Sequence, residues 1–168
     1  MALGTDDSSS DSPVRIRLAA SDDAPVVADI LHASFVEYQS LYTAPGFAAT
    51  TVDAQQVLVR MREGPVWIAL RHSDVVGTVA AVVKDNSLHL RGMAVRPESR
   101  RLKVGALLLD QAERFALEQG CRRIVLSTTP FLDAAIRLYE KSGFRPVQDG
   151  GHDLLGTPLF MMEKHIPR

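Results

Sequence analysis

Three consecutive strand-like runs, joined by links too short to hold a helix, constrain the fold more than any other feature of this sequence. The runs are residues 66–70 (VWIAL), 75–83 (VVGTVAAVV) and 88–95 (LHLRGMAV). The links contain HSD and KDNS, which are residue types that favour tight turns. Strands joined this closely pair antiparallel, because a parallel connection needs a dozen or more residues. The sequence therefore predicts an antiparallel meander near the middle of the chain.

Helical patterns flank the meander on both sides. Before it, the pattern predicts a strand at 14–18 and helices at about 22–36 and 52–62, the second ending at Gly64 and Pro65. After it, the pattern predicts a helix over 102–119 capped by Gly120, a buried strand at 122–127 (RRIVLS), a helix within 131–144 and closing strands at 144–147 and 158–164. The expected class is α+β, a mixed sheet with helices on its faces and one parallel βαβ unit.

Composition limits the partners that this chain can have. Its 168 residues are 46% hydrophobic, which suits one domain over 14–168 after a polar, disordered leader at 1–13. The formal net charge of −1 gives no whole-molecule attraction to nucleic acid or to acidic membranes, and no apolar stretch is long enough to span a bilayer. The single cysteine, Cys121, is expected to be a buried, inert thiol, and no metal is expected. We therefore expect a cytoplasmic protein, either a monomer or a homodimer.

A basic cluster lies where the predicted βαβ unit passes from strand to helix. Residues 100–109 read RRLKVGALLL, so charge, one glycine and an apolar run follow each other closely. The first turn of a helix leaves N–H groups without intrahelical acceptors, which makes it a natural anion site. The cluster alone fits an anion site and an ordinary solvated surface equally well.

Two segments together carry a family resemblance. VRPESRRLKVGALLL (95–109) and AIRLYEKSGF (135–144) resemble the two signature motifs of the GCN5-related N-acetyltransferases, in the same order and spacing. The resemblance covers about 14–164. It implies the GNAT fold, a central mixed, mostly antiparallel sheet of six to seven strands flanked by about four helices. It also implies acetyl-CoA as the acetyl donor.

The resemblance assigns a coenzyme site residue by residue. The main chain of Met93, Ala94 and Val95 would pair with the pantetheine arm, beside a bulge at Gly92. The second motif would contribute Leu132, Ala135, Leu138 and Tyr139. The diphosphate would lie on the loop and first helical turn, formed by Arg100, Arg101, Leu102, Lys103, Val104, Gly105 and Ala106. Lys103 replaces the first glycine of the family motif, and Leu132 replaces an asparagine that would contact the coenzyme.

Acetyl transfer to an amine also needs an acid for the leaving thiolate and a base for the amine. The resemblance gives the acid role to Tyr139, although the helical spacing of Tyr139 also fits a core aromatic. Candidate bases are Glu37 in the first helix or at its exit and His89 on the third run, with Glu98 a weaker choice in the phosphate loop. Each of these three also fits an ordinary structural position.

Two segments are candidates for the walls of the acceptor site. One is the aromatic stretch with Phe35, Tyr38, Tyr42 and Phe47, which could equally form a satellite core. The other is the glycine-containing loop at 148–157, where Asp149 and Asp153 could attract a cationic amine. His152 stands beside them, but this group is poor evidence for a metal.

These expectations favour an N-acetyltransferase that acts on a primary amine of a small molecule, peptide or protein. The alternative is a non-catalytic acyl-CoA-binding or sensing module of the same fold, a reading encouraged by Lys103 and Leu132. A dinucleotide-binding Rossmann domain is disfavoured because G-x-G-x-x-G is absent and the early strands are antiparallel.

Overall fold

The computed structural model describes residues 13–148 and 152–167, and it confirms the predicted meander. Strands β2 (Val66–Arg71), β3 (Asp74–Lys84) and β4 (Ser87–Val95) pair antiparallel in chain order. Their turns place His72, Asp85 and Asn86 at positive φ, a conformation that Asn, Asp and His tolerate better than most side chains. The short polar links thus set the direction of the chain as expected.

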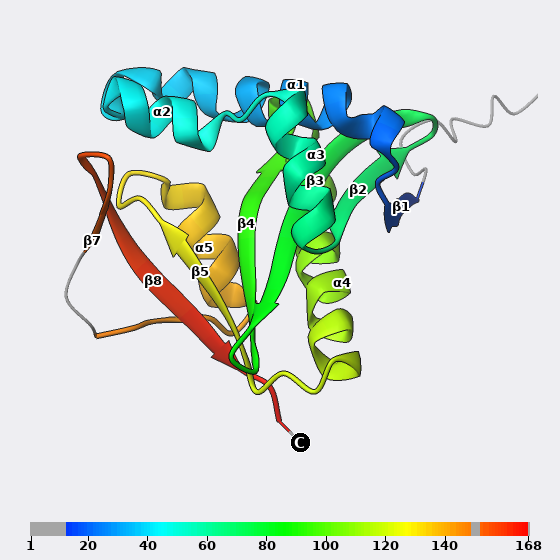
Figure 1. The fold of residues 1–168 in the computed structure, drawn as a ribbon, viewed down its shortest axis with the longest axis vertical. Helices are drawn as coiled ribbons and strands as arrows, with labels where there is room; N and C mark the ends of the chain where they lie inside the picture. Colours follow the sequence, from blue (N-terminus) through cyan, green and yellow to red (C-terminus); the bar gives the residue numbers. More distant parts are fainter. Residues whose placement is uncertain (1–12, 149–151, 168) are drawn as a thin grey trace, which may run out of the picture.

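The meander extends into one mixed sheet with the order β1-β2-β3-β4-β5-β8-β6. Strand β1 (Val14–Leu18) lies at one edge, and β5 (Arg123–Thr128) is the parallel neighbour of β4. Strand β8 (Thr157–His165) pairs with β5, with the two-residue β6 (Arg145–Pro146) and with β7 (His152–Leu154). The predicted mixed, mostly antiparallel sheet is confirmed, with β7 as a strand that the sequence did not indicate (Figure 1).

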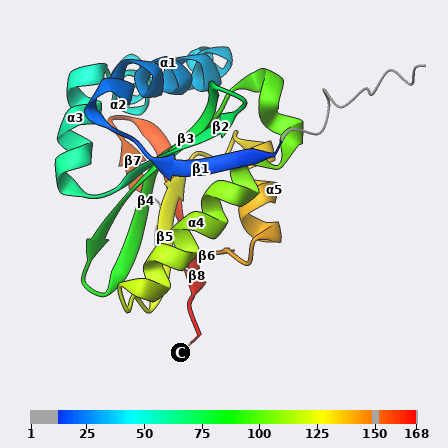
Figure 2. The ribbon, with the colours of Figure 1, turned by 90° about the vertical axis from the view of Figure 1, so that its right-hand side faces the viewer.

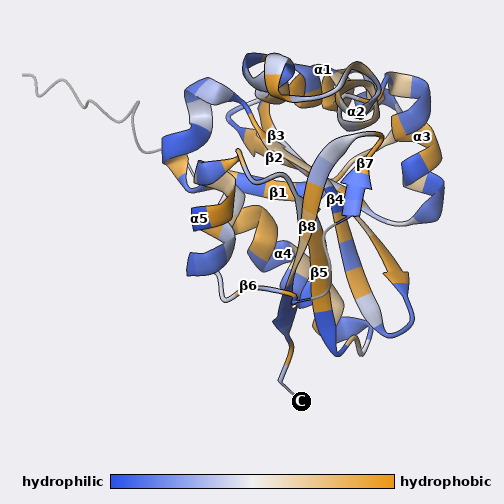
Figure 3. Ribbon diagram, turned by 90° about the vertical axis from the view of Figure 1, so that its left-hand side faces the viewer, coloured by the Kyte–Doolittle hydropathy of each residue, from blue (hydrophilic) through white to orange (hydrophobic). Residues whose placement is uncertain are grey.

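Helices cover both faces of this sheet, as Figure 2 shows. Helices α1 (Ala24–Phe35) and α3 (Ala54–Glu63) bury residues such as Ile30 and Val57 against Ile68 of β2. Helices α4 (Val104–Glu118) and α5 (Asp133–Lys141) form the second, larger core on the opposite face, which also holds the buried thiol of Cys121. Hydrophobic and hydrophilic residues alternate along the ribbon of α3 in Figure 3, as an amphipathic helix requires.

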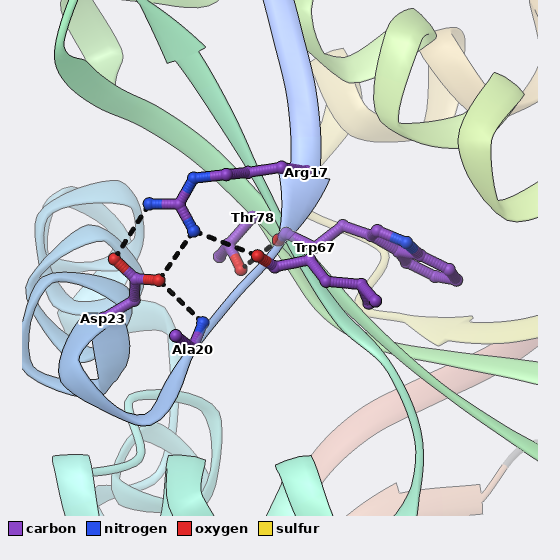
Figure 4. Close-up of polar contacts among 6 residues, drawn as sticks. Arg17, Ala20, Asp23, Trp67 and Thr78 are labelled. Atoms are coloured by element: carbon purple, nitrogen blue, oxygen red, sulfur yellow. Dashed lines mark hydrogen bonds and ion pairs between the residues drawn. The ribbon is translucent and has the colours of Figure 1, made fainter.

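Helix starts differ from the prediction in a consistent way, because short 3-10 turns precede or follow the helices. The first helix is a 3-10 turn at Ser21–Asp23 and then α1, and another 3-10 turn covers Val36–Leu41. The Asp23 carboxylate accepts hydrogen bonds from the Ala20 N–H (2.7 Å) and the Arg17 guanidinium (2.8 Å), which fixes the passage from β1 to α1 (Figure 4). A third 3-10 turn, Pro97–Leu102, carries the basic cluster, so α4 starts at Val104 rather than at residue 102.

The predicted aromatic loop contains a further helix, α2 (Ala44–Thr50). The Thr43 hydroxyl accepts a hydrogen bond from the Gly46 N–H (3.0 Å) at its N-terminus. The Thr43 N–H and hydroxyl bond in turn to Thr157 and Leu155 at the β7–β8 turn, at 2.9 Å each. Helix α2 and this hairpin therefore close over the same end of the sheet (Figure 1). Within the described residues, no helix combines the length and apolar character needed to cross a membrane.

Candidate active site

The site begins where β4 and β5 separate. The two parallel strands pair at only three positions, from Ser87 opposite Arg123 to His89 opposite Val125. Beyond His89, β4 also changes register against β3 between Thr78 and Ala80, where Gly92 adopts a φ of +61°. This irregularity lies at the predicted bulge. Because the strands diverge, the β5-facing edge of β4 beyond His89 makes no ladder with β5 (Figure 1).

A cavity of about 520 Å³, the first cavity, lies between the end of β4, the start of α4 and helix α5. Arg101, Leu102 and Val104 do not line it: Arg101 is exposed, whereas Leu102 and Val104 pack into the core. The structure brings the other predicted coenzyme residues together around this cavity: Met93, Ala94, Val95, Arg100, Lys103, Gly105, Ala106, Leu132, Ala135, Leu138 and Tyr139.

The start of α4 faces the first cavity with unused backbone donors. The first helical hydrogen bond runs from the Leu107 N–H to the Lys103 carbonyl (3.1 Å), which leaves the N–H groups of Val104, Gly105 and Ala106 without an intrahelical acceptor. No side chain caps this end, and its first turn contains no acidic residue. These donors and the helix dipole make the turn attractive to an anion.

Lys103 and Gly105 shape this turn in different ways. Lys103 is left-handed, with φ +60° and ψ +23°, so the position at which the family motif has glycine has kept the glycine conformation. Gly105 allows α4 to approach α5, because a Cβ there would lie 2.5 Å from Cδ2 of Leu138. The replacement of the first glycine therefore changes the side chain at this turn but not the path of the main chain.

Arg100 is held by the end of α1. Its guanidinium donates to the Ser34 carbonyl (3.1 Å) and forms an ion pair with Glu37. The Ser34 hydroxyl donates to the Val95 carbonyl at 2.8 Å, so α1, the end of β4 and the basic turn are joined. The Glu37 carboxylate lines neither cavity.

A second cavity, of about 480 Å³, opens on the other side of the strand separation. It runs along β4 and β5 and is bounded by α3, α2 and the β7–β8 hairpin, which contribute Arg60, Thr50 and Leu154. Tyr139 thus lies where the two cavities meet, as one of the residues that line both: Phe35, Met93, Leu132, Ala135 and Tyr139.

Tyr139 is both a core residue and a wall of the site. Its side chain is 8% exposed, and its ring packs against Phe144 with centroids 5.9 Å apart. Burial, and secondarily the nearby Tyr42, raises the pKa of its phenol to about 12. Among the described residues its hydroxyl has no hydrogen-bond partner. A protonated hydroxyl at the junction of the two cavities is a hydrogen-bond donor available to a ligand.

The aromatic stretch divides between wall and core. Phe35 lines both cavities, Tyr38 lines the first and Tyr42 the second. Phe47 lines neither and packs its ring against Tyr42 (5.9 Å between centroids) and His32. A residue that the sequence reasoning missed, Phe131, joins the two tyrosines, with its centroid 4.9 Å from that of Tyr42 and 6.2 Å from that of Tyr38.

The predicted loop at 148–157 is partly a hairpin. The Asp153 carboxylate accepts a hydrogen bond from the Gly156 N–H (2.7 Å) inside the β7–β8 turn, so it stabilises the turn and does not line the second cavity. The His152 ring lies 3.3 Å from the Ser127 hydroxyl. Asp149 lies outside the described residues. In the part of the chain that the structure describes, no group of three or more histidine, cysteine, aspartate or glutamate residues could hold a metal ion.

Of the three candidate bases, only His89 lines the second cavity. Burial lowers the pKa of its imidazole, and the charges of Lys84 and Arg123 add to the effect, so it is neutral near pH 7. His89 precedes Met93 by four residues, or about 13 Å along an extended strand. A proton from an amine beside Met93 would therefore reach His89 only through water. Glu98 is exposed and lines neither cavity.

Sequence reasoning missed Arg60 and Arg91, which line the second cavity from α3 and β4. Arg91 follows His89 by two residues, and this period is the signal that placed both on one face of the strand. Nothing in the sequence indicated that Arg60 crosses from α3 to the same place.

Comparisons with known proteins agree with this architecture. The model of the acetyltransferase (GNAT) family matches residues 27–144. Mouse N-acetylaspartate synthetase is 31% identical over 115 residues, which are 67% of this chain and 38% of that protein. Rat N-acetyltransferase family 8 member 3 is 31% identical over 110 residues, 62% of this chain and 48% of that protein. The chain thus spans less than half the length of these curated relatives.

Solved structures share the fold at lower identity. The PaiA N-acetyltransferase of Thermoplasma acidophilum, in complex with coenzyme A, superposes with a TM-score of 0.79 at 19% identity, covering 92% of this chain and 99% of that one. The Salmonella typhimurium protein yncA, with acetyl-CoA, gives a TM-score of 0.71 at 19% identity, covering 92% and 95%. The separated strands, the two motifs and the family match over 27–144 lead to one conclusion: the chain belongs to the acetyltransferase (GNAT) family.

Proposed function

We propose that this protein is an acetyl-CoA-dependent N-acetyltransferase that moves an acetyl group from the thioester directly to a primary amine. The observation that carries the proposal is the position of Tyr139, which lines both cavities where β4 and β5 separate. A donor in the first cavity and an acceptor in the second would meet beside its hydroxyl. Relatives named N-acetyltransferases and related structures solved with coenzyme A or acetyl-CoA support the same class.

The first cavity fits the donor. The diphosphate would accept hydrogen bonds from the N–H groups of Val104, Gly105 and Ala106, with the Lys103 ammonium adding attraction. The pantetheine arm would run along the unpaired edge of β4 from Met93 to Val95, as an added strand does. This path leads the sulfur end to Tyr139.

The chemistry then balances without a further co-reactant. The neutral amine nitrogen attacks the thioester carbonyl, the new C–N bond forms and the C–S bond breaks. A backbone N–H near Ala94 or Val95 would stabilise the charge on the carbonyl oxygen. The amine loses one proton to solvent or through water to His89, and the thiolate receives one from Tyr139, which regains a proton from solvent.

Burial defines how Tyr139 can act. With its pKa raised to about 12, the phenol stays protonated throughout the physiological range. Full transfer to a thiolate of ordinary pKa near 8.5 would be uphill by about 5 kcal/mol. The same apolar surroundings raise the pKa of a bound thiol, which narrows the gap. Tyr139 therefore acts first as a hydrogen-bond donor that stabilises the sulfur as negative charge develops on it.

A non-catalytic acyl-CoA-binding module remains the second candidate, because Leu132 offers no polar group to the coenzyme at the junction of the cavities. The second cavity favours an enzyme, since a binding module needs no space for an acceptor beside the sulfur. The acceptor itself does not follow from the relatives, whose names cover N-acetylaspartate and, for an Escherichia coli structure, ribosomal protein S18 alanine.

The two candidates differ in a thiol-release assay. Acetyl-CoA is mixed with the protein and a panel of primary amines, while coenzyme binding is measured separately by calorimetry. We expect binding in the first cavity and release of free thiol that depends on the added amine. Coenzyme binding without amine-dependent release would support the binding module instead.

A further inference from the structure

The second cavity is rich in positive charge. Within the part of the chain that the structure describes, its lining includes four basic side chains, three of them cationic near pH 7 and the fourth the neutral His89, and no acidic one. They come from α3, from the β3–β4 hairpin and from β4: Arg60, Lys84, His89 and Arg91. This concentration stands out because the whole chain carries a formal net charge of only −1. The cavity is therefore built to attract an anion locally.

Arg60 lies directly behind the bulge of β4. A Cβ added at Gly92 would lie 2.4 Å from Nη1 of Arg60, so the guanidinium rests against this glycine. No ion pair or hydrogen bond of the Arg60 guanidinium is found among the described residues. Burial lowers its pKa, and the charge of Arg91 lowers it further, so two guanidinium groups are close enough to repel each other.

Arg91 is only partly compensated. Its Nη2 pairs with Glu63 at 2.6 Å, but the Glu63 side chain is 45% exposed and lies outside the cavity lining. The Arg91 Nε is buried and has no hydrogen-bond partner in the described structure. One acid thus faces two arginines. A partly desolvated cation without a partner is costly, and a bound carboxylate would offset that cost.

The position of these arginines limits the size of the molecule that carries the anionic group. Gly92 immediately precedes Met93, and Arg91 precedes it by two residues, or about 7 Å along a strand. An anionic group held there would lie only a few bonds from an amine placed at the sulfur end of the coenzyme. Away from Gly92 the cavity is bordered by α2 and the β7–β8 hairpin, which the Thr43 and Thr157 side chains join at 3.1 Å.

We propose that the second cavity takes a small amine of the amino-acid type, whose carboxylate is held by Arg60 and Arg91 while its amine faces the thioester. This inference rests on the proposed function and names its substrate class. The planar guanidinium groups suit the two carboxylate oxygens, which a lysine in their place would not match. A peptide acceptor is disfavoured because an amide replaces the carboxylate beside its amine, so Arg60 and Arg91 would have no anion to hold there.

Matched pairs of amines test the proposal. Acetyl transfer is measured to three free amino acids, L-aspartate, L-alanine and β-alanine. It is also measured to the same compounds with every carboxylate converted to an amide, and to tripeptides with the same first residue. We expect kcat/KM for the free carboxylates to exceed that for the amides by about tenfold or more, as hydrogen bonds to charged groups imply. Equal rates for acids and amides, or a preference for tripeptides, would overturn the proposal.

Variants of the arginines test whether the preference for carboxylates arises in the second cavity. Arg60→Gln removes one guanidinium, whereas Arg62→Gln makes the same charge change on the exposed side of α3. The ratio of acid to amide should fall to near one in Arg60→Gln and stay unchanged in Arg62→Gln. Arg91→Gln provides a second reading if Arg60→Gln unfolds, and thermal unfolding of each variant checks the fold. Equal ratios in Arg60→Gln and Arg62→Gln would contradict the assignment.

The failure of this inference differs from the failure of the proposed function. Acetylation of amines without regard to their carboxylates would overturn the inference alone. Bound coenzyme with no transfer to any amine in the panel would overturn the proposed function and, with it, this inference.

Discussion

Arg100 and Glu37 form an ion pair that ties the basic turn before α4 to the 3-10 turn after α1. The same guanidinium donates to the Ser34 carbonyl. The Ser34 hydroxyl donates in turn to the Val95 carbonyl at the end of β4. The motif arginine is therefore held by protein groups on one side of the first cavity. Arg100 still lines this cavity, and the Glu37 carboxylate is engaged in an ion pair with it.

This pairing predicts that Glu37 positions the basic turn. The Glu37→Gln variant should weaken acetyl-CoA binding by about two- to fivefold, because an exposed ion pair contributes ~1 kcal/mol or less. Its kcat should change little, and the pH profile of kcat should keep its shape. Glu98→Gln, which removes an exposed acid of the neighbouring turn, is the matched control. A fall in kcat of about a hundredfold would instead show that Glu37 is the general base.

Tyr139 should be needed for turnover and not for binding. Tyr139→Phe keeps the buried ring that packs on Phe144 and removes only the hydroxyl. We expect kcat to fall by about 10²-fold, the lower range for a general acid, while the calorimetric Kd for acetyl-CoA stays within about twofold. Tyr38→Phe removes a hydroxyl from the first cavity away from the junction and should keep most activity. Equal kcat values for the two variants would argue against an acid role.

The left-handed conformation of Lys103 predicts a gain in stability on substitution by glycine. Lys103→Gly should raise the free energy of unfolding by about 0.5–1 kcal/mol. The strain of a side chain at positive φ is relieved, and this gain exceeds by that amount the cost of the extra chain entropy that glycine brings to the unfolded state. Arg101→Gly, two residues earlier and not at positive φ, should lower it. Urea unfolding at neutral pH measures both. Loss of stability in both variants would show that Lys103 is not strained.

The lowered pKa of His89 predicts how stability depends on pH. Below its ordinary value of 6.5, the unfolded chain binds a proton at this residue more readily than the folded chain does. The contribution of His89 to stability is therefore complete above pH 6.5 and declines as the pH falls from 6.5 through the lower folded pKa. His89→Gln should flatten the curve of unfolding free energy against pH in this window, measured by urea titration. If the slope of unfolding free energy against pH is the same in His89→Gln and in the unchanged protein, the imidazole is solvated in the folded state.

Those parts of the fold that rest on local patterns could be predicted from the sequence. The turn residues at His72, Asp85 and Asn86 and the period of α4 determine the meander and the βαβ unit without distant contacts. Helix α2 could not be predicted, since it has seven residues and its N-cap, Thr43, is held by Thr157, 114 residues away along the chain. The residue type of Lys103 does not indicate a left-handed conformation, because lysine usually favours the right-handed helix, and only its place at a glycine of the family motif pointed to it.

The same distinction between local and distant contacts applies to the candidate site. Tyr139 and Gly105 lie in the two segments that carry the family resemblance, and the resemblance also implied the place of Met93 at the end of the strand. The acceptor side depends on how α3 crosses β4, which brings Arg60 behind Gly92, and no pattern within either segment encodes that crossing. The engagement of Glu37 by Arg100 likewise joins two turns that are 63 residues apart along the chain.

A crystal structure with coenzyme A tests the central claim most directly. The account predicts that the diphosphate accepts hydrogen bonds of about 2.7–3.2 Å from the N–H groups of Val104, Gly105 and Ala106. It also predicts that the sulfur lies against the Tyr139 hydroxyl, where the two cavities meet. A diphosphate bound away from the start of α4, or a thiol directed away from Tyr139, would contradict it.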